Sequence, residues 1–232
     1  MKTLEDSKAL AREMVQIGTL AGRDMSAVIS DMDQPLGYAV GNALEVKEAI
    51  ATLNGNGPED LRELVLVLTS LMVVKAGKAK DIREARILLE ETLDSGKALQ
   101  VMKEWIVAQG GTAEEVEHPD LLPQALCQEA VCAEKCGFVT KIHTEEIGRI
   151  CMLLGGGRAK KGDPIDLSVG LVLRKKVGDP VHSGESLAIL HANDREKLAE
   201  AKERLLKAYE IKKEPVAVRP LIWEILDGTE AE

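Results

Sequence analysis

Apolar residues over the first 110 positions recur mostly at helical spacing. The first such face comprises Leu4, Ala11, Met14, Val15 and Ile17. This spacing predicts an amphipathic helix over residues 4–21, and Gly18 and Gly22 mark its end. Similar patterns predict four further helices, over residues 43–53, 58–72, 81–94 and 96–109.

One short run in this region predicts a strand. Residues 25–30 are mostly apolar and include the β-branched Val28 and Ile29. Because polar residues and Pro35 bound the run, it indicates one buried strand of a parallel sheet that follows a helix. After the loop that follows, Asn42 is a good helix N-cap, with Glu45 placed for a capping box.

The pattern shortens in the second half of the chain. Strands are expected over residues 130–133 and 138–142, around a turn at residues 135–137, and Thr144 is expected to cap a helix that ends at three glycines. Residues 171–190 then alternate short strands with glycine-rich turns, in the manner of a small β module. A helix over residues 195–208 and an apolar stretch at residues 221–223 close the chain.

The two halves are separated by an acidic stretch with little periodicity. Residues 112–123 carry two prolines and several acidic side chains, which is typical of a linker. We therefore expect three parts: residues 1–112, a linker over residues 113–125, and a second domain over residues 126–232.

Composition excludes several classes of partner. The chain has 232 residues, of which 45% are hydrophobic and only 2% aromatic, and a formal net charge of -9. Such a charge repels nucleic acid and anionic membranes, so a small molecule or a protein is the expected partner. The basic cluster at Arg174, Lys175 and Lys176 is interpreted as a solvated face. No run approaches a membrane span or a signal peptide, which favours a cytoplasmic protein.

The residues alone reveal no catalytic centre. The glycines at positions 155–157 leave a predicted helix end, whereas a phosphate-binding loop would enter a helix N-terminus. The histidines are expected at the surface or at helix caps; they are His118, His143, His182 and His191. The cysteines lack zinc-site spacing and are expected to be buried or half-buried thiols; they are Cys127, Cys132, Cys136 and Cys151.

One block is far more specific than these patterns. Residues 27–49 read AVISDMDQPLGYAVGNALEVKEA, and they resemble the central signature of the thymidine and pyrimidine-nucleoside phosphorylase family. The resemblance continues in order along the chain, through residues 1–3, 55–58, 146–148, 155–159, 169–173 and 175–179. Several independent motifs in one order make a chance similarity improbable.

The resemblance implies both a reaction and a fold. Members of this family cleave the glycosidic bond of a pyrimidine nucleoside with inorganic phosphate, which gives the free base and a pentose 1-phosphate. The implied fold class is α/β plus α+β. Residues 1–112 would be the later part of a helix-flanked, mainly parallel sheet domain, and residues 126–232 a carboxy-terminal α+β module with a turn-rich hairpin region.

The resemblance also implies that important residues lie elsewhere. The family's phosphate-binding, base-binding and catalytic residues precede the Met-Lys-Thr with which this sequence opens, so none is carried over and the chain is expected to start at an internal methionine. The neighbours of the strand at residues 25–30 would come mainly from that missing half, leaving open edges and uncovered apolar faces.

One functional element does carry over, a monovalent cation site. By position, Leu36 and Ala39 would supply backbone carbonyl oxygens and Glu48 a carboxylate. Hard oxygen ligands with little charge suit K⁺. In the alternative interpretation, Glu48 is a solvent-facing helix residue and the loop only leads to the Asn42 cap.

Three functions remain open at this point. The chain is a phosphorylase fragment that is inactive without its amino-terminal half, a noncatalytic module derived from such an enzyme, or the matching part of a related nucleoside-monophosphate phosphorylase. In the first case its partners are pyrimidine nucleoside, phosphate and the missing half, with a homodimer expected once it is complete.

Overall fold

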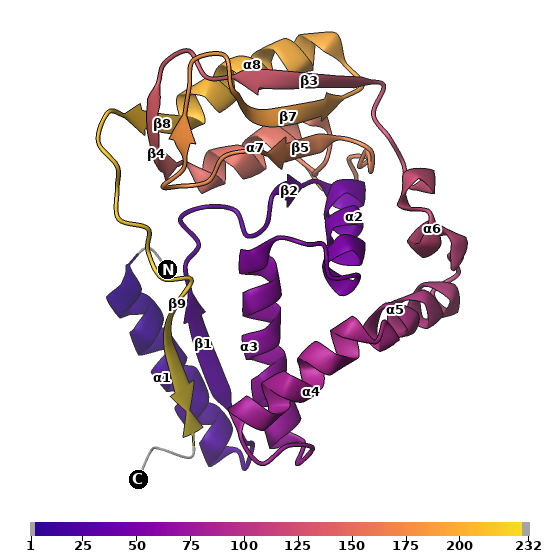
Figure 1. Cartoon of the computed structure of the whole chain (residues 1–232), viewed down its shortest axis with the longest axis vertical. Helices are drawn as coiled ribbons and strands as arrows, with labels where there is room; N and C mark the ends of the chain where they lie inside the picture. The colour runs from indigo at the N-terminus through magenta and orange to yellow at the C-terminus, as the bar shows by residue number, and fades with distance from the viewer. Residues whose placement is uncertain (1–2, 229–232) are drawn as a thin grey trace. The chain divides into compact units, whose positions relative to one another are not determined.

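The computed structural model describes residues 3–228, so Met1 and Lys2 of the opening motif lie outside the described residues. Helices and strands are mixed along the chain, as in an α+β protein (Figure 1). The described residues form two compact units. The first contains residues 3–31, 62–92 and 219–228, and the second contains Met32–Leu61 and Leu93–Val218.

The first unit combines helices with a two-stranded sheet. Its elements are α1 (Leu4–Leu20), β1 (Ser26–Ser30), most of α3 (Glu59–Lys75), most of α4 (Ile82–Asp94) and β9 (Ile222–Asp227). The Oγ1 atom of Thr3 caps α1 by accepting a hydrogen bond from the Asp6 N–H at 3.1 Å. The helix continues through Gly18, where an added Cβ would lie 2.2 Å from Cγ of Met25, so this glycine permits close packing and does not end the helix.

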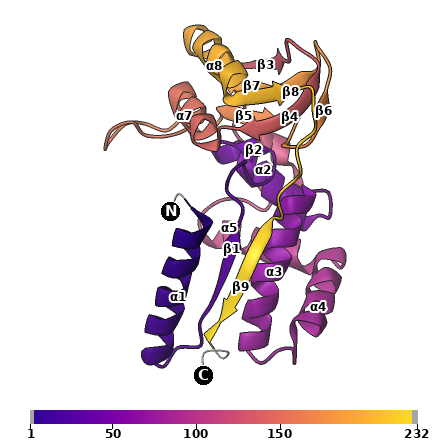
Figure 2. The ribbon, with the colours of Figure 1, turned by 90° about the vertical axis from the view of Figure 1, so that its left-hand side faces the viewer.

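Strand β1 has a partner that the local pattern did not predict. It pairs antiparallel with β9, with Val28 opposite Ile225, although the two strands stand almost 200 residues apart in the sequence. Figure 2 shows the two strands side by side, next to α1. The predicted strand is confirmed, but its pairing among the described residues is antiparallel, so the parallel sheet expected around it is not confirmed. Lys75, at the end of α3, forms ion pairs with Asp24, just before β1, and with Asp227 of β9.

The second unit holds the remaining elements. They are β2 (Ala39–Val40), α2 (Asn42–Leu53), α5 (Lys97–Ala108), α6 (Glu114–Glu117), the 3-10 turn η1 (Pro119–Leu121), β3 (Cys127–Cys132), β4 (Gly137–Ile142), α7 (Thr144–Leu154), β5 (Gly170–Leu173), β6 (Pro180–Val181), β7 (Ser186–Ala192), α8 (Arg195–Ala208) and β8 (Tyr209–Lys212). They build a four-stranded sheet of order β2-β5-β7-β3 and a three-stranded sheet of order β6-β4-β8 (Figure 1). Both sheets are antiparallel throughout.

This unit has a closed apolar core. Helices α7 and α8 pack against each other, and α8 also contacts β3 and β7. The side chains that they enclose include Val131, Val139, Ile147, Ile150, Leu171, Leu190 and Leu205. Each buried side chain of this size contributes on the order of 1.5–3 kcal/mol, so the core accounts for the arrangement of helices over strands.

Strands β3 and β4 do not form the hairpin that their spacing suggested. Strand β3 pairs with β7, and β4 pairs with β6 and β8. The reason lies just after β3, where Ala133 forms two backbone hydrogen bonds with the turn before β7. The Ala133 N–H donates to the Glu185 carbonyl, and the Gly184 N–H donates to the Ala133 carbonyl. The chain therefore stays beside β7 for one more residue before it crosses to the other sheet.

Two helix starts also differ from the sequence prediction. The N-cap of α2 is Gly41, and the Asn42 side chain instead donates to the carbonyl of Gly156 at 3.0 Å. Gly41 has φ 138, and an added Cβ there would lie 2.4 Å from the Val169 carbonyl oxygen. Glu45 accepts a hydrogen bond from the Gly41 N–H, four residues earlier, whereas the predicted capping box would have joined it to Asn42, three residues earlier.

The start of α7 shows the same one-residue shift. His143 occupies the N-cap position of α7, and Thr144 is the first helical residue, with its hydroxyl buried and without a hydrogen-bond partner. The predicted linker also has structure, because α6 and η1 lie within it and Val116 is buried.

The compact units do not follow the expected order of domains along the sequence, because each unit contains segments from both halves of the chain. Met32–Leu61 packs with Leu93–Val218, and the segment after Val218 returns to the first unit as β9. The boundaries at residues 112 and 126 therefore stay predictions. None of the described helices combines the length and the apolar character that a membrane crossing requires.

Candidate functional site

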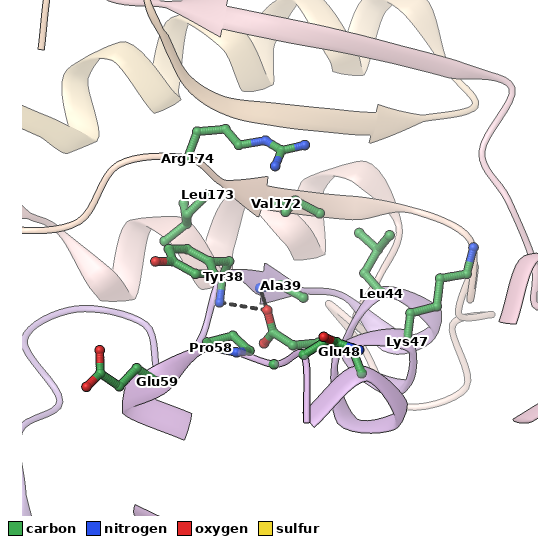
Figure 3. Close-up of a pocket in the computed structure, with 13 residues that line it drawn as sticks. Tyr38, Ala39, Leu44, Lys47, Glu48, Pro58, Glu59, Val172, Leu173 and Arg174 are labelled. Carbon is green, nitrogen blue, oxygen red and sulfur yellow. Dashed lines mark hydrogen bonds between the residues drawn. The ribbon is translucent and has the colours of Figure 1, made fainter. Parts of the chain in front are cut away.

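The three predicted cation ligands all belong to the second unit. Leu36 is half-buried in the loop before β2, Ala39 is buried at the start of β2, and Glu48 is half-buried in α2. Figure 3 shows the Glu48 carboxylate directed towards Tyr38 and Ala39. The fold therefore brings Ala39 and Glu48 into direct contact, although nine residues separate them.

The Glu48 carboxylate organises the end of the loop. Its Oε1 atom accepts hydrogen bonds from the backbone N–H groups of Tyr38, at 2.9 Å, and Ala39, at 3.0 Å (Figure 3). Burial raises the pKa of Glu48 above its ordinary value, although these two hydrogen bonds act in the opposite direction. Glu48 is thus a half-buried acceptor, and the alternative of a solvent-facing helix residue does not describe it.

The sheet register sets the direction of the Ala39 carbonyl group. The Leu173 N–H donates to the Tyr38 carbonyl at 2.8 Å, and Ala39 lies opposite Val172 in the β2–β5 pairing. Neighbouring residues on an antiparallel strand alternate between facing the partner strand and facing away. The Ala39 N–H and C=O therefore both face away from β5, on the side from which Glu48 binds that N–H.

A second carboxylate and one lysine border the same loop. Oδ2 of Asp60 accepts a hydrogen bond from the Gly37 N–H at 3.1 Å and lies 3.0 Å from Nζ of Lys176. The Lys176 ammonium also donates to the carbonyl oxygens of Pro35 and Gly37. The Leu36 carbonyl lies between these two bonded carbonyls in the sequence.

A cavity of about 570 Å³ opens beside Glu48. Its wall includes Tyr38, Lys47 and Glu48 from the loop and α2, together with Arg174 just after β5 (Figure 3). Apolar side chains from α2 and β5 complete the wall. The cavity is therefore large enough for a small ligand or for a segment of another chain, and it carries charges of both signs.

Comparison with known protein families gives two matches along the chain. Residues 1–99 match the family model described as the glycosyl transferase family a/b domain. Residues 138–212 match the model described as the pyrimidine nucleoside phosphorylase C-terminal domain.

Individual relatives agree with these matches. A pyrimidine-nucleoside phosphorylase of Geobacillus stearothermophilus is 51% identical over 224 residues, which cover 97% of this chain and 52% of the relative. One of Bacillus subtilis (strain 168) is 58% identical over 193 residues, which cover 83% of this chain and 45% of the relative. This chain belongs to the pyrimidine-nucleoside phosphorylase family. It spans about half the length of the curated relatives that it matches.

In this member of the pyrimidine-nucleoside phosphorylase family, the triple glycine is a helix end, as the pattern predicted. Gly155 has φ 111, and its N–H donates to the Met152 carbonyl at 3.0 Å. The Gly156 N–H donates to the Cys151 carbonyl at 2.9 Å. Both N–H groups thus donate to carbonyl groups at the end of α7, so neither is available to bind a phosphate.

One histidine of this pyrimidine-nucleoside phosphorylase family member contradicts its prediction. His191 is buried within β7, and burial lowers the pKa of His191, with a smaller effect from Lys47 and Arg174. His143 does occupy a helix cap, as expected, and its Nε2 atom lies 2.9 Å from Oε1 of Glu210. A continuous apolar run was the signal for His191, because its neighbours in β7 are apolar and such a run indicates a strand that is buried on both faces.

The cysteines agree with their prediction only in part. Cys151 is buried, with its pKa raised to about 11 mainly by burial, and Cys127 is half-buried. Cys132 and Cys136 are exposed, contrary to the prediction. Within residues 3–228, no group of three or more His, Cys, Asp or Glu side chains could hold a metal ion.

Lys176 is the residue that the sequence analysis missed. It was interpreted as part of a solvated basic face, yet its side chain is only 13% exposed and contacts the candidate loop. A possible signal was its place in the Lys-Val-Gly-Asp turn at residues 176–179, one of the segments that resemble the family.

Proposed function

We propose that this chain supplies part of a pyrimidine-nucleoside phosphorylase. In that reaction the bond between the sugar C1′ and the pyrimidine nitrogen breaks, a bond from C1′ to a phosphate oxygen forms, and the base leaves with a proton. The similarity of 51% to 58% to proteins of that name supports the proposal. The observation that carries it is the loop before β2, in which the family's signature residues make specific contacts with Glu48.

The proposal includes a K⁺ site made by the carbonyl oxygens of Leu36 and Ala39 and the carboxylate of Glu48. Three observations suit this ion. The Ala39 carbonyl faces the side on which Glu48 lies, the carboxylate is half-buried, and the donor set is made only of oxygen. Bound K⁺ would supply a fixed positive charge beside the phosphate site of the complete enzyme.

The residues of this chain would act by holding that site in shape. Glu48 fixes the backbone of Tyr38 and Ala39, and Asp60 fixes that of Gly37. With both carboxylates bound to backbone N–H groups, the carbonyl groups of the loop keep their directions. Glu48 would therefore serve both as a ligand and as a support for the loop.

We further propose that the missing half of the enzyme completes the first unit. Among the described residues β1 pairs with β9 alone, which leaves its other edge open. Strands from the remaining part of the enzyme would pair there and build the mainly parallel sheet, and the complete enzyme would form a homodimer. Without that remaining part, the chain by itself would lack phosphorolytic activity.

A noncatalytic module is the second candidate, and the closed core of the second unit favours it. That core encloses more than ten fully buried apolar side chains without help from another chain. A unit of this kind could persist as a binding module after the loss of catalysis.

A phosphorolysis assay separates the first two candidates. The purified chain, produced in a host without nucleoside phosphorylases, is incubated with thymidine or uridine and phosphate, and free base is measured by chromatography. We expect no release by the chain alone and measurable release after addition of the amino-terminal half of the Bacillus subtilis relative. Release by the chain alone would overturn the proposed dependence on the other half.

A further inference from the structure

The Lys176 ammonium occupies a place that a free cation would otherwise suit. It donates to the carbonyl oxygens of Pro35 and of Gly37, the latter at 2.6 Å, and it lies 3.0 Å from Oδ2 of Asp60. The ring of Tyr38 lies 5.5 Å from the same nitrogen. Two carbonyl oxygens, a carboxylate and an aromatic face therefore surround one positive charge that is covalently part of the chain.

The turn that carries Lys176 is itself fixed. The backbone N–H of Lys176 donates to Oδ2 of Asp179 at 2.7 Å, and the next N–H, of Val177, donates to the Gln34 side chain at 3.0 Å. The lysine thus emerges from a rigid turn that is already joined to the start of the loop. The backbone entropy of this turn is therefore already lost, and only the rotamer entropy of the lysine side chain opposes binding of its ammonium.

The contacts of Lys176 join the two regions that match separate family models. Its own position lies within residues 138–212, whereas Pro35, Gly37 and Asp60 lie within residues 1–99. All four residues belong to the second compact unit. The loop therefore receives charge from both sides, from the Lys176 ammonium at its carbonyl groups and from the carboxylates at its N–H groups.

We propose that Lys176 is a positioning residue, whose ammonium acts as a tethered cation that fixes the backbone of residues 35–39. The loop then keeps its shape whether or not K⁺ is bound beside Glu48. This proposal depends only on the contacts of the loop and not on the proposed phosphorolysis, so the two can fail separately.

Lys175 offers a matched control. It is the preceding lysine, its side chain is 16% exposed, and it forms an ion pair with Glu185 at 2.5 Å. Its Nζ atom donates to the Pro180 carbonyl at 2.9 Å. Lys175 thus resembles Lys176 in burial and in bonding, but no hydrogen bond or ion pair described for it reaches residues 35–39.

The first test is amide hydrogen exchange in the full chain, followed by NMR. In Lys176→Met the amide protons of Gly37, Tyr38 and Ala39 should exchange roughly ten- to a hundredfold faster, because a hydrogen bond to a charged group is lost and the loop opens more often. The same amides should change less than about twofold in Lys175→Met. Equal effects of the two substitutions, or no effect of the first, would overturn the proposal.

A chemical rescue distinguishes a role of the charge from a role of the bulk. Lys176→Ala removes three methylene groups and the ammonium, which propylammonium can replace. We expect propylammonium at tens of millimolar, a concentration suited to a weak site of roughly 10 mM affinity, to slow exchange of the three loop amides again. 1-Propanol, which has the same chain without the charge, should not.

Loss of folding is monitored in the same spectra. The amide protons of β5 and β7 report on the folding of the core. If these amides also exchange faster in both Lys176 variants, Asp60→Asn is used in place of those variants. This substitution weakens the binding of the Lys176 ammonium by changing its partner. In Asp60→Asn the amides of Tyr38 and Ala39, which donate to Glu48 and not to Asp60, should again exchange at least tenfold faster than in the unmodified chain. An equal response to propylammonium and 1-propanol, or unchanged Tyr38 and Ala39 amides in Asp60→Asn, would contradict the tethered-cation role.

Discussion

The two compact units differ in how completely they bury their apolar side chains. In the second unit, Val131, Val139 and Ile147 are 0% exposed within one continuous core. In the first unit, Ile17 is 64% and Leu20 is 81% exposed on α1. The difference teaches that one unit satisfies its own hydrophobic pattern, whereas the other displays an amphipathic helix face with no cover in this structure.

The site lies on the self-sufficient unit. The loop, Glu48, Asp60 and Lys176 all belong to it, so their geometry does not depend on how the first unit is completed. The first unit instead carries the open strand edge of β1. We therefore expect the shape of the loop to survive in the isolated chain, and the reaction to need the completed first unit.

The largest effect should come from the core of the second unit. Ile147→Ala removes a fully buried side chain and should lower the free energy of unfolding by about 2–5 kcal/mol. Leu20→Ala, on the exposed face of α1, should change it by less than about 0.5 kcal/mol. Urea denaturation of both variants measures the difference, and similar losses would show that the two units do not differ as described.

The next effect concerns the close approach of the α2 N-terminus to β5. Gly41→Ala combines a φ of 138 with a Cβ that would lie 2.4 Å from the Val169 carbonyl oxygen, so we expect a loss of about 1–3 kcal/mol or more. Gly55→Ala is the control, because Gly55 has φ 80 but no atom within 4 Å of an added Cβ. Its loss should be only about 1 kcal/mol. Thermal unfolding measures the loss of stability in the two variants. A larger loss in Gly55→Ala than in Gly41→Ala would contradict this prediction.

A smaller effect should follow the charge of Glu48. Its folded-state pKa is raised, so the stabilisation from its neutral form is fully present below the ordinary value and is lost as the pH rises through the raised value. Glu48→Gln carries no such charge, and its stability relative to the unmodified chain should therefore improve as the pH rises from 4 towards 7. Urea titrations across this range measure the trend, and a difference that stays constant with pH would contradict it.

The smallest effect should come from a surface ion pair of the first unit. Lys8 lies 2.6 Å from Glu224 and links α1 to β9, with both side chains partly exposed. Lys8→Met should cost about 0.2–1 kcal/mol at low salt and almost nothing in 1 M NaCl, where the charges are screened. Denaturation at the two salt concentrations checks this, and a loss that persists at high salt would point to packing instead.

Helices and most strands could be predicted from the sequence, because their periodicity is a local property. The strand pairings could not. Nothing near β1 indicates β9, and the turn after β3 gives no sign that the chain crosses to a second sheet at Ala133. Long-range pairing is decided by the core that the strands enclose together, which a local pattern does not contain.

The site was predicted only where the resemblance supplied it. The resemblance pointed to Leu36, Ala39 and Glu48, and the structure adds how the last two are held together. Lys176 looked like any lysine in a charged cluster, because burial of its ammonium depends on a loop almost 140 residues earlier. The shift from Asn42 to Gly41 has a similar cause, since the approach of Val169 decides it.

The most direct test of the account is a chimera in which this chain replaces the matching half of the Bacillus subtilis relative. We expect the chimera to release free base from thymidine or uridine in the presence of phosphate, faster with K⁺ than with Na⁺. In the Glu48→Gln chimera this preference for K⁺ should be lost. A folded chimera that releases no base, or a Glu48→Gln form with an unchanged response to K⁺, would contradict the account.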